Sequence, residues 1–247
     1  MLLQILVHYI LRGGVIMINN FNISDKIGDI FTVFPGASNL FLEYRIDFCC
    51  GGNRPLTEAI KEQNIDENKI LTLLNERYKE FQEKNEEFTD WAKEKPSKLV
   101  DYIVETHHAY LKEELPKISE LAFKILAVHG KSHEELFKVH KLFNTLRTEL
   151  EEHLVKEEEL LFPIIKEYEV EKNNHNKQKV LNLLNELEKE HTGAGDIIKE
   201  LREVTEHYTA PKDACKTFEL TYKKLMELEQ DTFQHIHLEN NILFKSI

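Results

Sequence analysis

His153-Leu-Val-Lys-Glu157-Glu-Glu-Leu-Leu-Phe162 and His235-Ile-His-Leu-Glu239-Asn-Asn-Ile-Leu-Phe244 repeat one pattern of residues in two distant parts of the chain. Each stretch has a histidine, a glutamate four residues later, an aliphatic pair and a phenylalanine. Residues four apart lie on one face of an α-helix, so each stretch offers an imidazole and a carboxylate side by side. Two such pairs on facing helices would supply at least half of the ligands of a dinuclear metal site.

Outward from these stretches, the apolar spacing from Lys98 onward predicts four long amphipathic helices. The breaks between them fall at residues 130–132, 172–174 and 209–211, which are rich in Gly, Asn and Pro. Short connections make successive helices antiparallel, so the chain is predicted to form an up-down four-helix bundle.

The heights of the histidines in this bundle can be compared, because two residues of an antiparallel hairpin lie level when the turn is midway between them. For one set of histidines, the three successive midpoints fall on or beside the three breaks. We therefore predict that this set lies in one layer with one residue on each helix. The set is His108, His153, His191 and His235.

Four imidazoles buried together need a chemical reason, because unpaired polar groups are costly to remove from water. Glu157 and Glu239 reach the same layer, and buried carboxylates usually pair with a charge or coordinate a metal. Four histidines and two glutamates suit two first-row transition ions with bridging carboxylates. Iron is favoured over zinc, since zinc prefers four ligands and this set leaves positions open. A polar network without metal is the alternative interpretation.

A competing ligand set also exists in the sequence. The pairs Glu105/His108 and Glu188/His191 match the Glu-x-x-His signature of ferritin-like di-iron bundles, with Glu157 and Glu239 as lone carboxylates. That set leaves His153 and His235 without a role, although they begin the two matching stretches. The histidine-rich set is therefore the favoured prediction.

The remaining histidines of the predicted bundle are expected to be surface or helix-end residues. His107 and His237 point off the face used by the neighbouring ligands, and the others are His129, His133, His140, His175 and His207. His129 retains the alternative role of a donor behind a ligand. Glu158 and Glu159 are expected to face solvent or to accept hydrogen bonds from ligand histidines.

Asp47-Phe-Cys49-Cys50-Gly-Gly52 lies between two predicted helices. The glycines allow unusual backbone angles and are expected to expose the sulfurs. Cys49 and Cys50 are therefore candidates for redox exchange, for metal binding or for docking a client's cluster. Cys215 stands alone and is predicted to be a structural residue on a helix. Three cysteines do not form a disulfide framework, so a reducing cytoplasm is the expected location.

The domain organisation follows from these features. Residues 18–80 are predicted to form a small helical domain, with helices at 27–33, 37–44, 56–61 and 67–78, followed by a linker at 81–96 and the bundle at 97–247. Residues 1–17 are too short an apolar segment to span a bilayer and lack a signal cleavage site. We expect them to be a leader or a mis-assigned start, with Met17 as the alternative start.

Composition agrees with an all-α protein. Of the 247 residues, 41% are hydrophobic and 31% are charged, with few Gly and Pro, which is typical of long amphipathic helices. The net charge of −12 argues against nucleic acid or an anionic membrane as a partner.

In the cysteine motif, the two matching stretches and Glu190-His191, the chain resembles the RIC (repair of iron centres) family, the ScdA/YtfE type of di-iron protein. The resemblance covers residues 20–245 and implies a hemerythrin-like bundle with two carboxylate-bridged iron ions. It implies His108, His153, His191 and His235 as terminal ligands and Glu157 and Glu239 as bridges. It also implies a homodimer formed through the cysteine domain. Lys245 stands where the family usually has proline, which leaves the ligands untouched.

The function implied by the resemblance is repair of iron–sulfur clusters damaged by nitrosative or oxidative stress. Iron donation and nitric oxide chemistry at the di-iron centre are both open, so whether the protein is an enzyme is left undecided. Damaged iron–sulfur proteins are the expected partners, with nitric oxide or oxygen as small ligands. The alternative is a module that binds or senses oxygen or nitric oxide, or stores iron, without turnover. Reversible oxygen transport is disfavoured, since oxygen-carrying hemerythrins have a carboxylate five residues after the last histidine and this chain has it after four.

Overall fold

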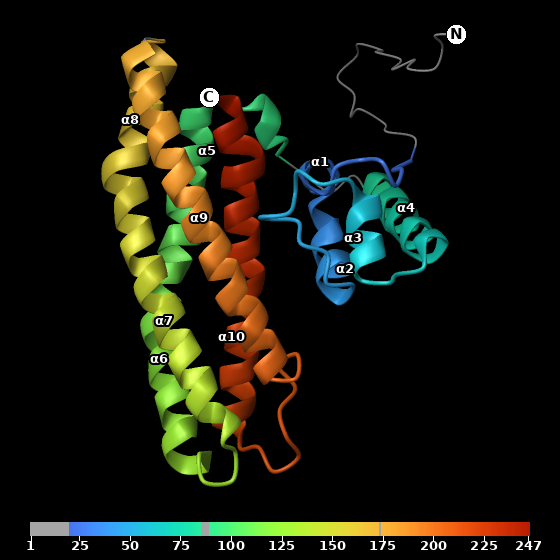
Figure 1. Ribbon diagram of the computed structural model, residues 1–247, viewed down its shortest axis with the longest axis vertical. Coiled ribbons are helices and arrows are strands. Elements are labelled where there is room, and N and C mark those ends of the chain that lie inside the picture. Colours follow the sequence, from blue (N-terminus) through green and yellow to red (C-terminus); the bar gives the residue numbers. More distant parts are fainter. Residues whose placement is uncertain (1–19, 85–88, 173) are drawn as a thin grey trace.

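The computed structural model describes residues 20–84, 89–172 and 174–247, and the leader predicted at residues 1–17 lies outside them. Within the described residues the regular structure is helical, and the only strand-like pairing is an isolated bridge between Lys26 and Pro55. Figure 1 shows a tall bundle with a smaller helical unit attached beside α10 (Lys216–His237). The predicted all-α fold, a bundle preceded by a small helical domain, is confirmed.

The N-terminal unit contains four short α-helices and one 3₁₀ turn. They are α1 (Ile27–Val33), η1 (Pro35–Ala37), α2 (Ser38–Glu43), α3 (Leu56–Glu62) and α4 (Glu67–Lys84). Helix α4 buries Ile70, Leu74 and Tyr78, which are spaced four apart and so lie on one face. It runs six residues beyond the predicted end at 78, because residues 79–84 are good helix formers and continue the same face.

The elements from α5 onward form four arms of the bundle, and Figure 1 shows that successive arms run antiparallel. The first two arms are α5 (Pro96–Ile103), η3 (Val104–His108) and α6 (Ala109–His129), then α7 (Glu135–Lys156), η4 (Glu157–Leu161) and α8 (Phe162–Val170). The last two are α9 (Asn174–Val204), then α10, η5 (Leu238–Leu243) and the 3₁₀ turn η6 (Phe244–Ser246). The short 3₁₀ turn η2 (Trp91–Lys93) precedes α5.

Three arms are interrupted by a π-helical turn at the same level. These turns are η3, η4 and η5, and each contains one predicted ligand: His108, Glu157 or Glu239. A π turn accommodates an extra residue within a helix and is frequent at functional sites. The apolar spacing of these arms predicts regular α-helices, so the π turns were not predicted.

The polar layer that contains the predicted ligands lies between two apolar clusters. On each arm, the apolar residue on one side of the polar layer belongs to the first cluster, and the apolar residue on the other side belongs to the second. The first includes Leu111, Leu154, Ala194 and Ile236, and the second includes Ile103, Leu161, Leu187 and Ile242. The first cluster continues into the N-terminal unit, where Phe48 meets Phe233 of α10 at a ring-centroid distance of 6.1 Å.

Among the described residues, every helix is too short or too polar to cross a bilayer.

Candidate metal centre

Four histidines from the four arms of the bundle form two close pairs. The Nε2 atoms of His108 and His235 are 3.2 Å apart, and those of His153 and His191 are 3.0 Å apart. All four side chains are buried, with at most 3% of each residue exposed. The structure thus brings the predicted histidines into one layer.

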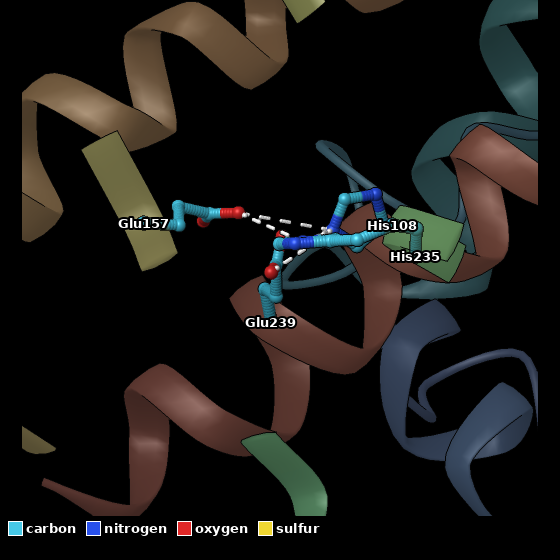
Figure 2. Close-up of side chains that lie close together, drawn as sticks. All are labelled: His108, Glu157, His235 and Glu239. Carbon is cyan, nitrogen blue, oxygen red and sulfur yellow. Dashed lines mark hydrogen bonds and ion pairs between the residues drawn. The ribbon is translucent and has the colours of Figure 1, made fainter. Parts of the chain in front are cut away.

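The two predicted glutamates each reach both pairs. Glu157 Oε2 lies 3.3 Å from His108 Nε2 and 3.3 Å from His153 Nε2. Glu239 Oε1 lies 3.0 Å from His235 Nε2, and Glu239 Oε2 lies 3.2 Å from His191 Nε2. Figure 2 shows this convergence for one pair, with both carboxylates directed at His108 and His235. Each carboxylate is therefore placed to bridge two positions.

Hydrogen bonds behind the histidines fix their orientation. His108 donates a hydrogen bond from Nδ1–H to Glu158 Oε1 at 2.7 Å, and His153 donates one from Nδ1–H to Glu190 Oε2 at 2.9 Å. His191 Nδ1–H donates to Asn240 Oδ1 at 2.8 Å. These acceptors hold a proton on Nδ1, so the Nε2 atom of each of these three rings points into the centre. The Nδ1 atom of His235 has no hydrogen-bond partner among the described residues.

The two matching stretches have matching roles in space. Glu158 and Asn240 directly follow Glu157 and Glu239, and each accepts a hydrogen bond from a ligand histidine of another arm. Phe162 stacks on His108 at an interplanar angle of 24°, and Phe244 stacks on His191 at 9°. The repeated pattern thus supplies a carboxylate, an acceptor and an aromatic backing on both sides of the centre.

Electrostatics of the centre are dominated by the two buried carboxylates. Burial acts to raise the pKa of Glu239, but the charges of His235 and His191 hold it well below its ordinary value. Burial acts to lower the pKa of His153, yet the adjacent Glu157 and Glu190 raise it to about 10. Two negative charges at 0% exposure are therefore stable only with positive charge beside them.

The donor set fits metal cations. Neither oxygen of Glu157 accepts a hydrogen bond within the described part of the chain, although Oε2 is close to two imidazole nitrogens. Neutral imidazole nitrogens and carboxylate oxygens that face one another repel unless a positive charge lies between them, either a metal ion or a proton on the ring. The six residues divide into two groups, His108/His235 and His153/His191, each sharing Glu157 and Glu239 with ligand atoms within 4.8 Å of one another. This mixed nitrogen and oxygen environment suits first-row transition metals.

The competing ligand set does not form. Glu105 and Glu188 are exposed, and neither contributes to the buried groups around the centre.

Two histidines predicted to lie at the surface are buried instead. His107 is 2% exposed, donates from Nδ1 to Asp231 at 2.9 Å and stacks parallel to His235. His237 is also 2% exposed and packs its ring edge against Phe31 of the N-terminal unit. For His237 the prediction was wrong because it considered only the bundle, and for His107 it was wrong because the partner Asp231 lies on another arm, far away in sequence. The flanking Ile236 and Leu238 indicate a helix buried on more than one face, and they could have given a signal for His237.

His129 and Cys215 lie at the turn end of the bundle, far along α6 from His108. His129 Nε2 is 3.2 Å from Cys215 Sγ, so the alternative role of His129 behind a ligand is wrong. Cys215 precedes α10 and is exposed, which contradicts the prediction of a structural residue within a helix. Backbone N–H groups of the first turn of α10, and then His129, lower the pKa of its thiol to about 7.

Of the remaining histidines, His133 and His140 are half-buried and His207 is exposed, while the side chain of His175 is outside the described ones.

The cysteine pair lies in a loop folded around Asp47. Asp47 Oδ1 accepts hydrogen bonds from the backbone N–H groups of Cys49, Cys50 and Gly51 at 3.0–3.2 Å. The thiols are free, with 3.7 Å between the two Sγ atoms. Cys50 is half-buried, but Cys49 is 1% exposed, so the expectation that both sulfurs are exposed was wrong for Cys49. Burial raises the pKa of the Cys49 thiol well above its ordinary value.

Comparison with known proteins identifies both parts of the chain. Residues 99–247 match the hemerythrin HHE cation-binding domain, and residues 23–78 match ScdA_N, a domain of unknown function. The chain is 34% identical to the iron-sulfur cluster repair protein ScdA of Staphylococcus haemolyticus, over 88% of this chain and 95% of that protein. It is 32% identical to a probable iron-sulfur cluster repair protein of Haemophilus influenzae, with 90% and 96% covered. The iron-sulfur cluster repair protein YtfE of Salmonella paratyphi B is 31% identical, with 88% and 94% covered.

Proposed function

Since the chain belongs to the family of the iron–sulfur cluster repair proteins ScdA and YtfE, we propose that it helps to repair iron–sulfur clusters damaged by nitrosative or oxidative stress. In this proposal, two iron ions are held by His108, His153, Glu157, His191, His235 and Glu239. The domain at 97–247 holds the metal, the domain at 18–80 presents Cys49 and Cys50, and residues 81–96 link them.

The observation that supports this proposal most strongly is the contact of each glutamate with one histidine of both pairs. Each ion would receive two imidazoles and a share of two bridging carboxylates. That is fewer ligands than iron accepts, so positions remain open for exchange with a small ligand or a client. Bound iron would supply a labile ferrous pair for donation and a binding site for nitric oxide or oxygen.

The protein's own residues would control access and affinity. Glu158, Glu190 and Asn240 orient three of the histidines, which keeps the ligand geometry ready in the absence of metal. The two apolar clusters on either side of the layer exclude water from the ligands. Cys50 is the more accessible sulfur of the pair, so it is the one that would meet a client's cluster, with Cys49 behind it.

The expected partners are iron–sulfur proteins with damaged clusters. The three free thiols favour a reducing compartment such as the cytoplasm. A homodimer through the cysteine domain remains part of the proposal. The names of the relatives favour repair over a module that only binds oxygen or nitric oxide or stores iron.

The deciding experiment uses anaerobically purified protein with its iron content measured. Iron transfer to a nitric oxide-damaged cluster protein should restore the client's activity and should be lost when Cys49 and Cys50 are both replaced by alanine. The double variant should keep its two iron ions, and Cys215→Ala should behave as wild type. Catalytic consumption of nitric oxide without client repair would favour the enzymatic version, and protein purified without appreciable iron would refute the proposal.

A further inference from the structure

The cysteine loop is attached to the metal-binding arm by the side chain of Asn241. Asn241 lies in the π turn η5, two residues after Glu239, and is 7% exposed. Its Nδ2 donates hydrogen bonds to the backbone carbonyls of Phe48 at 3.2 Å and Cys49 at 3.1 Å. One amide group thus holds the backbone on which the buried thiol is mounted.

The N-terminal unit has a glycine-lined recess for this amide. A Cβ atom on Gly28 would lie 2.7 Å from Asn241 Oδ1, and one on Gly52 would lie 2.5 Å from it. Gly28 N–H donates to the Gly52 carbonyl at 2.8 Å, so the two glycines are themselves joined beside the amide. Any other residue at these positions would push Asn241 away from the loop.

A second contact joins the loop to a ligand. The thiol of Cys50 donates to the backbone carbonyl of His191 at 3.5 Å, and its Sγ faces the position where a Cβ on Gly195 would stand, also at 3.5 Å. His191 in turn donates from Nδ1 to Asn240. Consecutive residues therefore have separate tasks: Asn240 holds a ligand, and Asn241 holds the cysteine loop.

The first matching stretch shows that the metal layer does not itself need a residue like Asn241. Glu158 corresponds to Asn240 and likewise accepts from a ligand histidine. Glu159 corresponds to Asn241, but it is exposed and in none of the contacts just described. The contact made by Asn241 thus serves the N-terminal unit.

We propose that Asn241 is a positioning residue that couples metal binding at the centre to closure of the cysteine loop. Metal fixes Glu239 and hence the turn η5, which keeps the Asn241 amide on the loop and Cys49 buried. Without metal, repulsion between the buried Glu157 and Glu239 loosens η5, and the loop opens more often. Because linkage is reciprocal, an open loop weakens metal binding by the same factor. The inference rests on the proposed metal centre but not on the repair activity.

The test measures alkylation of Cys49 by iodoacetamide, followed by mass spectrometry of the peptide, in chelator-stripped protein with and without Mn²⁺. Mn²⁺ is chosen because it has little affinity for thiolates and its binding is read by electron paramagnetic resonance. The background is Cys215→Ser, which removes the exposed thiol of low pKa. Mn²⁺ should slow alkylation of Cys49 at least about fivefold, the lower end of common coupling factors.

Two isosteric variants separate the roles. Asn241→Asp keeps the shape but places an acceptor opposite two carbonyls, so alkylation of Cys49 should be fast with and without Mn²⁺ while Mn²⁺ still binds. Asn182→Asp makes the same change at an exposed position of α9 and should show the wild-type protection. His153→Ala, which removes a proposed ligand, should abolish protection.

Three results would overturn the inference. In Asn241→Asp, undiminished protection by Mn²⁺ would show that the amide is not the link, and complete loss of Mn²⁺ would assign Asn241 to the integrity of the centre. Protection that persists in His153→Ala would locate Mn²⁺ at Asp47 and the cysteines instead. Failure of the wild type to bind Mn²⁺ or Fe²⁺ would remove the proposed function itself, which is a distinguishable outcome.

Discussion

At the scale of single residues, Glu157 contacts one histidine of each pair through the same oxygen. Glu157→Gln keeps the size of the side chain but removes the charge that a bridging ligand needs. We expect metal content to fall to half or less of the wild-type value, while the helical circular dichroism signal is retained. Glu159→Gln is the matched control, since Glu159 is exposed two residues away. Equal metal content in both variants would exclude Glu157 as a ligand.

Glu190 supports the centre from behind His153 and has a matched neighbour. Lys156 contacts both Glu190 and Glu186, but only Glu190 accepts a hydrogen bond from the Nδ1–H of His153. Hydrogen-bond partners of metal-bound histidines typically contribute about 10–100-fold in affinity. Glu190→Gln should weaken Fe²⁺ binding by such a factor in a chelator competition, and Glu186→Gln should leave it within about twofold of the wild type. Similar losses in both would point to Lys156 instead of the histidine contact.

The metal-free protein should become less stable as pH rises. The pKa of His153 is raised from 6.5 to about 10, so its stabilising contribution is complete below pH 6.5 and is lost as pH rises through about 10. The free energy of unfolding should therefore fall by up to about 5 kcal/mol across this interval. Urea denaturation in the presence of a chelator measures it. In His153→Gln the slope with pH should be much smaller, and an unchanged slope would contradict the assignment.

Several of these residues could be predicted from sequence, and others could not. The six side chains of the centre were found because helical spacing and turn positions fix both the face and the height of a residue. The burial of Cys49 and His237 was missed, because it depends on contact between the N-terminal unit and α10, which no local spacing records. His107 was missed because its partner, Asp231, is 124 residues away in sequence.

At the scale of elements, the π turns decide where ligand side chains point. The turn η4 spans Glu157 to Leu161 and includes both a proposed ligand and the acceptor Glu158. Deleting the exposed Glu159 would convert this turn to regular α-helix and keep the two flanking helices in register, because a π turn holds one extra residue. We expect unchanged helix content but at least about tenfold weaker metal binding, as Glu157 and Glu158 would be displaced.

This deletion is read by circular dichroism together with titration of Fe²⁺ under anaerobic conditions. Glu159→Ala keeps the chain length and should bind metal normally. If the deletion variant also bound normally, the π turn would have no role in placing the ligands.

The helix limits themselves were largely predictable, since α1 has the expected ends and the arms break where turn residues cluster. The π turns were not, because their extra residue leaves the i, i+4 pattern of apolar residues intact.

At the scale of the whole molecule, the apolar core joins the two units. Phe48 is 1% exposed and contacts Phe31, Phe41 and Phe233, which belong to both units. Phe48→Ala should lower the free energy of unfolding by about 3–5 kcal/mol, the usual range for a large core aromatic. Phe123→Ala is the control, because Phe123 is 61% exposed and should change stability by no more than about 0.5 kcal/mol.

Chemical denaturation followed at far-ultraviolet wavelengths measures both variants. Because the core is shared, wild-type unfolding should be one cooperative transition of the whole described structure. Two separated transitions, with Phe48→Ala affecting only the smaller one, would show that the units are energetically independent.

The two matching stretches also bear on the history of the molecule. Two helical hairpins that each provide two histidines and one glutamate are what duplication and fusion of an ancestral gene would leave, with a twofold axis through the metal layer. That symmetry is broken at one corner, where Asn241 occupies the place that Glu159 has in the other copy. The N-terminal unit is attached at this corner. In that case the metal-ligand arrangement would be older than its contact with the N-terminal unit, and Asn241 would mark the place where this cysteine-bearing unit was added to the bundle.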